Sequence, residues 1–428
     1  MNRRTTGTAA QVASSQIALA GSNYLVLAIA ARNLDPAGFA ALSSFYLLVN
    51  TFGRGLFSAV ELETTRAVAE ADVFGRTDGP ARRASVRHTL VLLAGALVLV
   101  GGSTPLLSKA LGSGTGAAGL LATGAVAMAA SYLLRGPLAG HRCYGLYAST
   151  FWLESAAGLV AAVLLAVNGV SETTAWIAAL AAAPLVAAAV LGRAASQVRS
   201  PKAATPTTAD LVDPGSGARG GVYWSAALLL AGQGVWNLAP VLVTSRLTDQ
   251  PALAAGFVTV AVLLRAPVLL FPSVQALLLP AFTAMVSTGD DAAVRRTTRR
   301  LGLLMIGAGV VWVLVGVVLV PFVSHLVFGA TVTPPLWVLG LLAVSTVVGA
   351  GAQIGQTHLV AARRPAAAAA AWIAGLGVLV LLGLLLVPPL TAATLGQLIG
   401  AIVVLIVLTI VRRRPAETPE EPTTGAKP

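Results

Sequence analysis

The chain has 428 residues, of which 56% are hydrophobic and 10% are charged, and its formal net charge is +12. Soluble domains carry about 25% charged residues, so this composition excludes a soluble globular protein and indicates one that lies in lipid. The single cysteine, Cys143, excludes a disulfide framework and a cysteine metal cluster. In a membrane protein an excess of basic residues marks the cytoplasmic loops, so no nucleic-acid partner is expected.

The apolar residues are grouped into segments long enough to cross a membrane, which takes about 20 residues per helix. Twelve such segments follow one another along the chain. They are residues 7–31, 36–62, 89–108, part of 111–134, 145–167, 173–192, 220–245, 252–285, two within 301–362 and two within 365–411. The sequence therefore predicts an all-α integral membrane protein with twelve transmembrane helices.

The segments divide into two halves of six. The prediction is an N-terminal six-helix lobe over 1–192, a cytoplasmic linker over 193–219, a C-terminal six-helix lobe over 220–412 and a disordered cytoplasmic tail over 413–428. A shift of 214 residues places Asn237 on Asn23 and Arg246 on Arg32. Parallel repeats of this kind are a transporter architecture, so we expect two pseudo-symmetric lobes around a central cavity.

The basic residues predict the orientation. With the N-terminus inside the cell, 23 of the 28 lysines and arginines fall in cytoplasmic segments. Three face outside (Arg32, Lys109 and Arg246) and two lie inside the membrane (Arg54 and Arg265). Because cytoplasmic loops carry the excess of Lys and Arg, the expected location is a bacterial cytoplasmic membrane, with both termini cytoplasmic.

Two arginines lie near the middle of predicted spans, where a charge costs about 2.5–3.5 kcal/mol on insertion scales and normally faces a cavity or a partner. Arg54 belongs to a polar stripe with Asn50, Ser58 and Glu61, spaced four, four and three residues apart on one helix face. Arg265 lies in the eighth segment. Arginine forms forked hydrogen bonds with phosphate, so both are candidate anion contacts. For Arg54 a structural ion pair is the alternative.

The eighth segment also contains three prolines, Pro267, Pro272 and Pro280. Prolines free backbone carbonyls and kink a helix, which membrane proteins tolerate where neighbouring groups or cavity water satisfy those carbonyls. We therefore expect a kinked helix whose irregular part lines the central cavity.

Four amides are further candidate substrate contacts. Asn23 lies on the first segment, Asn50 on the second, and Gln233 and Asn237 on the seventh. Amides within spans either contact a ligand or form hydrogen bonds between helices, and the sequence leaves both interpretations open.

Two acids within the spans are candidates for proton or ion coupling. Glu61 either lines the cavity or reaches the cytoplasmic interface. Glu154, about ten Å inside the fifth segment by the helical rise, is either a coupling site or the ion-pair partner of Arg135 or Arg142.

The sequence contains no motif that indicates an enzyme. A phosphate-binding Walker loop, a catalytic outside loop and an acidic nucleotide-sugar motif are all absent from it. The histidines lack the spacing of a metal site, and we expect His88 and His141, at cytoplasmic helix ends, to be solvated. Neither a cofactor nor a metal is expected.

Three segments resemble one superfamily, the multidrug/oligosaccharidyl-lipid/polysaccharide (MOP) exporters. Residues 31–39 (ARNLDPAGF) resemble its turn between the first two helices, residues 134–140 (LRGPLAG) its connection between helices four and five, and residues 265–280 its eighth helix. Within the superfamily the chain is most similar to bacterial polysaccharide biosynthesis flippases of the O-antigen type. The resemblance covers about residues 10–412.

The resemblance implies alternating access, in which two lobes move a polyprenyl-pyrophosphate-linked glycan across the membrane. It also implies contact with membrane lipid, and a glycan polymerase or glycosyltransferases as partners. Lipid II flippases of the superfamily hold a pyrophosphate with arginines on the first, second and eighth helices. Here Arg54 and Arg265 match the second and eighth, while the first offers only Asn23. The two extra helices of those flippases are missing, so another polyprenyl-linked glycan is expected in place of lipid II.

Two other functions remain open from the sequence. MATE-type antiporters rely on acids within the membrane, and Glu61 and Glu154 make a cation-coupled multidrug antiporter the alternative. The third hypothesis is a membrane scaffold without transport activity, which recruits a partner through the linker and tail.

Overall fold

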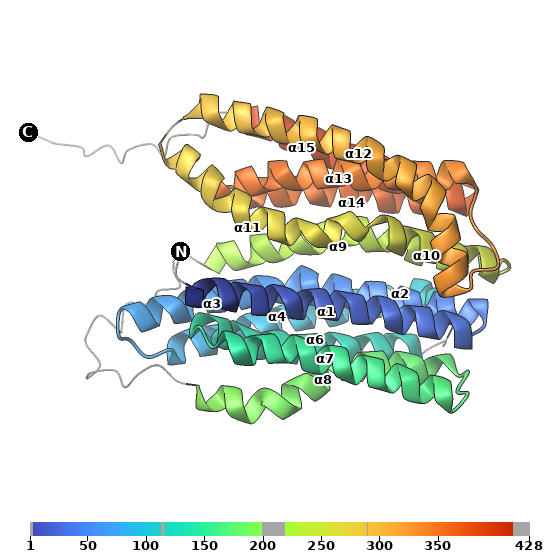
Figure 1. The fold of residues 1–428 in the computed structure, drawn as a ribbon, viewed down its shortest axis with the longest axis horizontal. Coiled ribbons are helices and arrows are strands. Elements are labelled where there is room, and N and C mark those ends of the chain that lie inside the picture. The colour runs from blue at the N-terminus through green and yellow to red at the C-terminus, as the bar shows by residue number, and fades with distance from the viewer. Residues whose placement is uncertain (1–2, 113–115, 199–218, 289, 414–428) are drawn as a thin grey trace, which may run out of the picture.

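The computed structural model describes residues 3–112, 116–198, 219–288 and 290–413, and these residues form helices and short connections without a strand. Figure 1 shows two groups of long helices lying side by side, with both termini at one end. The first group contains α1 (Arg3–Asn33), α2 (Pro36–Phe52), the π-helical turn η1 (Gly53–Phe57), α3 (Ser58–Val73), α4 (Gly79–Gly102), α5 (Thr104–Leu111), α6 (Gly116–Gly140), α7 (Tyr144–Val167) and α8 (Thr173–Gln197).

The second group is α9 (Arg219–Arg246), α10 (Pro251–Leu264), α11 (Ala266–Ser287), α12 (Asp291–Phe328), α13 (Leu336–Ala361), α14 (Pro365–Leu385) and α15 (Pro389–Arg413). We refer to the two groups as the N-lobe and the C-lobe. We call the end of the bundle where α1 begins and α15 finishes the termini end, and the other end the Arg32 end.

Ten helices of the described residues are long and apolar enough to cross a membrane. They correspond to all the predicted spans except the second and the eighth. Those two segments do form helices, but each is divided near its middle, into α2, η1 and α3 and into α10 and α11. The two-lobed all-α membrane fold is thus confirmed, and the number of twelve crossings stays a prediction.

Local sequence signals account for several helix ends. Asp35 caps α2 by accepting a hydrogen bond from the Gly38 amide, and Pro36 takes the first helical position. Asp290 caps α12 in the same way through the Ala293 amide. Gly329 finishes α12 in the left-handed conformation, with φ of 65°, which glycine adopts without steric cost.

The second segment is divided by a π-helical turn that contains Arg54. Two glycines flank this arginine because neighbouring helices approach closely there. A Cβ atom on Gly53 would lie 2.8 Å from the Met128 sulfur, and one on Gly55 would lie 2.8 Å from the Leu230 Cα atom. Such π-helical turns occur frequently at functional sites.

The eighth segment is divided at Arg265, two residues before Pro267, whereas the sequence predicted one kinked helix over 252–285. Pro267 has no amide hydrogen to continue the ladder, and Arg265 takes φ of −86° and ψ of 0°. The break frees carbonyl groups that side chains then satisfy: Tyr24 donates to the Val262 carbonyl at 2.9 Å and Trp312 to the Leu264 carbonyl at 3.1 Å. The C-lobe break is therefore stabilised partly by the N-lobe.

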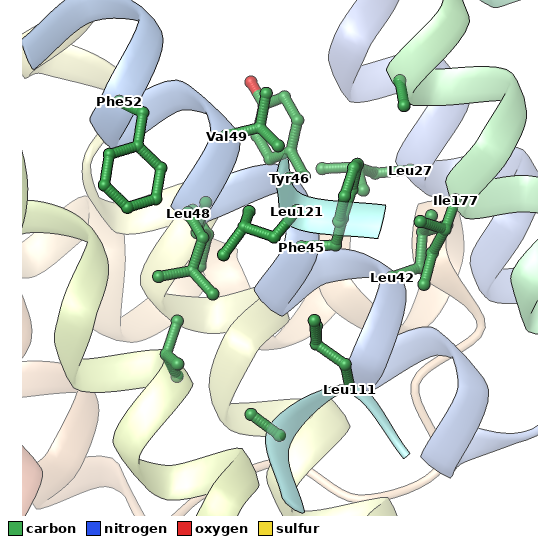
Figure 2. Close-up of a cluster of buried hydrophobic side chains, with 14 of the residues drawn as sticks. Leu27, Leu42, Phe45, Tyr46, Leu48, Val49, Phe52, Leu111, Leu121 and Ile177 are labelled. Atoms are coloured by element: carbon green, nitrogen blue, oxygen red, sulfur yellow. The ribbon is translucent and has the colours of Figure 1, made fainter. Parts of the chain in front are cut away.

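The two lobes meet along an apolar seam. On the N-lobe side it is formed by α1, α2, η1, α3 and α5, and on the C-lobe side by α9, α10 and α12. The largest buried apolar cluster includes Phe45 and Leu42 of α2 together with Val241, Val258 and Phe328 of the C-lobe. Figure 2 shows the N-lobe part of this cluster around the Phe45 ring. Because lipid tails are as apolar as these side chains, close van der Waals packing and hydrogen bonds across the seam hold the lobes together.

Gly55 provides a test of the seam. Gly55→Ala should destabilise the protein by about 1–3 kcal/mol, the usual cost of overpacking, because its Cβ atom would meet the backbone of Leu230 in the other lobe. Gly95→Ala is the matched control, since nothing lies within 4 Å of a Cβ atom there, and alanine favours a helix by about 0.5–1 kcal/mol. Thermal unfolding in detergent measures both. Equal midpoints for the two variants would contradict the close approach at Gly55.

Arg32 and Arg246, which the 214-residue shift superimposes, have similar roles at the Arg32 end of the bundle. Arg246 donates through Nη1 to the Gly383 and Leu386 carbonyls, where α14 finishes. Arg32 donates to the Leu326 and Val327 carbonyls, where α12 finishes. A cation stabilises a helix C-terminus by hydrogen bonding and by the helix dipole. Arg246 binds within its own lobe, whereas Arg32 binds across the seam.

The predicted linker and tail fall mostly outside the described residues. Helix α8 continues to Gln197, five residues beyond the predicted lobe boundary at 192, and α9 begins at Arg219. Residues 199–218 and 414–428 are not among those described. The boundaries of the two lobes, the linker and the tail therefore stay predictions.

Candidate functional site

The polar stripe of the second segment is the accessible face of an otherwise buried segment. From Gly38 to Val60 every residue is buried apart from Asn50, Arg54 and Ser58, which are partly exposed, and Glu61 follows on the same face. Side chains spaced three or four residues apart share one helix face. The stripe therefore belongs to the candidate site.

Arg54 projects from the π-helical turn at mid-length of the second segment. Ser58 donates a hydrogen bond to the Arg54 carbonyl, which stabilises the turn. Among the residues that the structure describes, no carboxylate lies within ion-pair distance of the Arg54 guanidinium. The structural ion pair considered for Arg54 is thus not formed within the described part of the chain.

Arg265 lies at the break between α10 and α11 and is 9% exposed. Its Nη1 donates to the Asn237 side-chain oxygen, while its Nε finds no hydrogen-bond partner among the described residues. Like Arg54, it has no carboxylate at ion-pair distance within those residues. A buried guanidinium held only by neutral groups is a site that favours an anion.

Tyr24 of α1 connects the two arginines, and the sequence analysis missed it. Its hydroxyl interacts electrostatically with Arg265 and with Arg54 while donating to the Val262 carbonyl. The contact joins residues 238 positions apart in the sequence, so no local pattern reveals it. The first helix thus contributes Tyr24 where the resemblance suggested Asn23.

The candidate amides take different places. Asn237 is buried and donates to Thr51 across the seam at 2.9 Å and to Gln233 at 3.3 Å. Asn50 donates to the Tyr46 carbonyl of its own helix. Asn23 is half-buried on α1. Of the four, Asn237 contacts Arg265, Gln233 contacts Asn237, and Asn50 lies one turn before Arg54.

A second cluster lies within the N-lobe. Arg135 forms a 2.6 Å ion pair with Glu154, and their side chains are 2% and 8% exposed. The Arg135 guanidinium also donates to Thr150 at 3.0 Å and stacks over the Phe151 ring at 4.0 Å. Of the alternatives for Glu154, the structure forms the pair with Arg135. The sequence predicts Arg135 to be one of the cytoplasmic basic residues, but the structure buries its side chain within the N-lobe.

Glu61 lies between this cluster and the polar stripe. Its carboxylate accepts a 2.7 Å hydrogen bond from the Tyr147 hydroxyl and interacts electrostatically with Arg135. It is half-buried. Its interactions with Arg135 and Tyr147 place Glu61 beside the N-lobe cluster. Its partial exposure places the Glu61 carboxylate at the end of the polar stripe.

The expectation that His88 and His141 are solvated is wrong. His88 is buried and packs its edge against Tyr223 of the C-lobe. The His141 side chain is 4% exposed and lies between Asp72 at 2.8 Å and Asp78 at 3.0 Å. Helix ends at the bundle surface are covered by their neighbours, which the position in the sequence does not reveal.

Asp72, Asp78, Arg82 and His141 form a polar cluster at the termini end, and this cluster favours the ionised form of Asp78. Partial burial opposes ionisation, but hydrogen bonds from Arg82 and His141 outweigh it and hold the pKa of the Asp78 carboxyl below its usual range. Arg82 also donates to the Val198 carbonyl at 2.6 Å, at the last described residue before 219. This cluster ties together the termini ends of α3, α4, α6 and α8 and is separate from the candidate site.

No family model matches the chain, and no curated protein matches it. Solved structures do. The fold is similar to a multidrug resistance MATE family transporter of the MOP superfamily in an inward-facing conformation, with a TM-score of 0.68, 13% identity, and coverage of 92% of this chain and 94% of that one. It is also similar to the lipid II flippase MurJ in an inward closed conformation, with a TM-score of 0.61, 11% identity, and coverage of 95% and 87%.

The chain shares the fold of these MATE and MurJ structures. This confirms the fold that the three resembling segments suggested. An outward-facing MATE family transporter matches with a TM-score of 0.55, 13% identity, and coverage of 95% and 94%. In this fold, Arg54, Arg265 and Tyr24 lie where the second, eighth and first segments meet between the lobes.

Proposed function

We propose that the protein is a flippase that moves a polyprenyl-pyrophosphate-linked oligosaccharide or polysaccharide precursor across the bacterial cytoplasmic membrane by alternating access. Arg54 and Arg265 bind the pyrophosphate, and Tyr24, Asn50, Gln233 and Asn23 line the path of the substrate.

The observation that supports it is the charge of the site. Arg265 is buried and Arg54 is partly exposed within predicted spans, and neither pairs with a carboxylate of the described residues. Arg135 provides the contrast, since Glu154 neutralises it. An unpaired charge in this position is costly, and a pyrophosphate supplies negative charge and accepts forked hydrogen bonds from both guanidinium groups.

Three contacts across the seam bear on the conformation. Tyr24 donates to the Val262 carbonyl, Arg32 caps α12, and the Phe39 and Phe328 rings lie 6.4 Å apart. With the predicted orientation, the Arg32 and Phe39–Phe328 contacts lie on the outer side, whereas Tyr24 lies beside Arg265 and the His88–Tyr223 contact joins the lobes nearer the termini end. The higher TM-score to an inward-facing than to an outward-facing MATE structure supports an inward-facing arrangement.

The test is a flipping assay with the full chain in proteoliposomes. A fluorescent polyprenyl-pyrophosphate oligosaccharide is expected to cross at a rate far above that of protein-free vesicles, while a fluorescent phosphatidylcholine of similar size is not. Equal rates for the two lipids would contradict the proposal. Uptake of an organic cation in the same vesicles tests the antiporter alternative.

Glu61 is the observation that favours this second candidate, a cation-coupled antiporter of MATE type. It is a partly exposed carboxylate at the end of the polar stripe, and it accepts a hydrogen bond from the Tyr147 hydroxyl. Glu154 is less suited, because its charge is already balanced by Arg135. Cation uptake that Glu61→Gln abolishes, without flipping of the pyrophosphate lipid, would establish the antiporter.

The orientation gives a separate prediction. In a Cys143→Ser background, Asp249→Cys at the Arg32 end should react with an impermeant thiol reagent in intact cells, and Gln197→Cys at the termini end should react only after lysis. Both positions are exposed, so access depends on the side of the membrane alone. Labelling of residue 197 but not 249 in intact cells would reverse the predicted topology.

A further inference from the structure

Asn237 connects the anion site to the seam between the lobes. Its side-chain oxygen accepts a hydrogen bond from Arg265, and its side-chain nitrogen donates to Thr51 of the other lobe at 2.9 Å. Both Asn237 and Thr51 are buried. One amide group therefore contacts a candidate substrate residue on one side and the opposite lobe on the other.

The chemistry fixes the direction of each bond. A guanidinium only donates, so the Asn237 atom facing Arg265 is the oxygen. Thr51 donates its own hydroxyl hydrogen to the Leu47 carbonyl at 2.8 Å, so its oxygen accepts from Asn237. The result is a directed chain from Arg265 through Asn237 to Thr51 and Leu47, which crosses the seam once.

Bonds in such a chain strengthen one another. A cation at the amide oxygen polarises the amide and makes its nitrogen a better donor, and this cooperativity is larger in a medium of low dielectric. When Arg265 turns from Asn237 toward an anion, the amide loses that polarisation, and its bond to Thr51 weakens. The occupancy of Arg265 and the strength of the seam are therefore linked.

We propose that Asn237 is a positioning residue that couples anion binding at Arg265 to release of the seam at Thr51. The coupling rests on the proposed function, because it takes Arg265 to be the anion contact. Thr51 and Arg265 are also the two residues that the 214-residue repeat superimposes. The two halves thus place different side chains at one repeat position, and Asn237 contacts both.

The experiment measures separation of the lobes at the Arg32 end. Spin labels on Ala37→Cys and Thr331→Cys, in a Cys143→Ser background, report the distance by double electron–electron resonance. Both positions are exposed. Ala37 lies two residues before Phe39, and Thr331 lies three residues after Phe328, so the two labels lie near this ring contact on opposite sides of the seam. Detergent-solubilised full chain is measured with and without saturating inorganic pyrophosphate.

Without pyrophosphate, Thr51→Val and Asn237→Ala should each raise the ratio of separated to closed lobes about fivefold, the effect of one ordinary hydrogen bond. Thr51→Ser keeps the acceptor oxygen and should match the wild type. Thr394→Val is the matched control, because the one hydrogen bond that the buried Thr394 hydroxyl forms among the described residues goes to the Leu390 carbonyl of its own helix. It should leave the ratio unchanged.

With pyrophosphate, the wild type should shift toward separated lobes, and Asn237→Ala should show no further shift. Equal shifts in the wild type and in Asn237→Ala would overturn the coupling and leave the anion site in place. If pyrophosphate does not move the wild type while Thr51→Val still separates the lobes, the anion site itself is wrong and the coupling falls with it. Thr51→Val behaving like Thr394→Val would also overturn the coupling.

Discussion

Replacing Arg265 or Arg54 by alanine is expected to slow flipping of a polyprenyl-pyrophosphate oligosaccharide by about 10- to 100-fold each, because a hydrogen bond to a charged group contributes about 1.5–3 kcal/mol. Both guanidinium groups lack a carboxylate partner among the described residues, so their loss removes a substrate contact and breaks no ion pair there. Flipping in proteoliposomes, normalised to the amount of folded protein, measures the effect.

Substitution by lysine separates charge from geometry. Arg54→Lys and Arg265→Lys should recover flipping only in part, because an ammonium group keeps the charge and loses the planar fork. Arg246→Ala serves as the matched control, since Arg246 caps α14 at the Arg32 end, away from the site. It should flip at the wild-type rate. Wild-type flipping by both alanine variants would contradict the mechanism.

The ion pair between Arg135 and Glu154 should dominate the stability of the N-lobe. Glu154→Gln leaves the 2%-exposed Arg135 without its counter-charge, and removing one partner of a buried pair costs about 3–5 kcal/mol. Arg135→Met should destabilise by a similar amount. Thermal unfolding in detergent measures both variants.

The double variant Arg135→Met/Glu154→Leu should recover most of the loss, because apolar residues of similar volume often replace a buried pair without cost. Glu63→Gln is the control, since the pair between Glu63 and Arg66 is exposed and contributes at most about 1 kcal/mol. A Glu154→Gln protein that unfolds like the wild type but has lost transport would identify Glu154 as a coupling site instead of a structural one.

The sequence predicts the spans well because lipid imposes their length and composition. Helices α7, α8, α9, α13 and α14 begin or end within a few residues of the predicted segments. The depth of Arg54 and of Arg265, which follows from counting residues along an apolar run, stays a prediction. The prolines of the eighth segment predicted an irregularity near Arg265, and the structure has a full break there. What the pattern does not contain is the π-helical turn at Arg54, because such a turn differs little in residue composition from a regular helix.

The contacts that build the site could not be predicted for a different reason. Tyr24 and Val262, and likewise Thr51 and Asn237, lie in different lobes and are 238 and 186 positions apart. Their meeting depends on how the lobes pack, which periodicity within a helix does not encode. The histidine prediction failed for the same reason, since Asp72 and Asp78 reach His141 from neighbouring helices.

The repeat shows how similar sequences acquire different contacts. Arg32 and Arg246 are superimposed by the 214-residue shift, and each caps a helix at the Arg32 end. Arg246 stays within the C-lobe, while Arg32 reaches across the seam to α12. A pair of equivalent arginines thus includes one that holds a lobe together and one that holds the two lobes to each other.

Equilibrium binding of a polyprenyl-pyrophosphate lipid to the full chain in nanodiscs tests the central claim most directly, with the matching monophosphate lipid as the comparison. The wild type is expected to bind the pyrophosphate lipid more tightly, since two guanidinium groups can engage its two phosphates. The double variant Arg54→Ala/Arg265→Ala is expected to lose about 100-fold or more in affinity, at 1.5–3 kcal/mol for each charged hydrogen bond. Equal affinity of the wild type and the double variant for the pyrophosphate lipid would contradict the account.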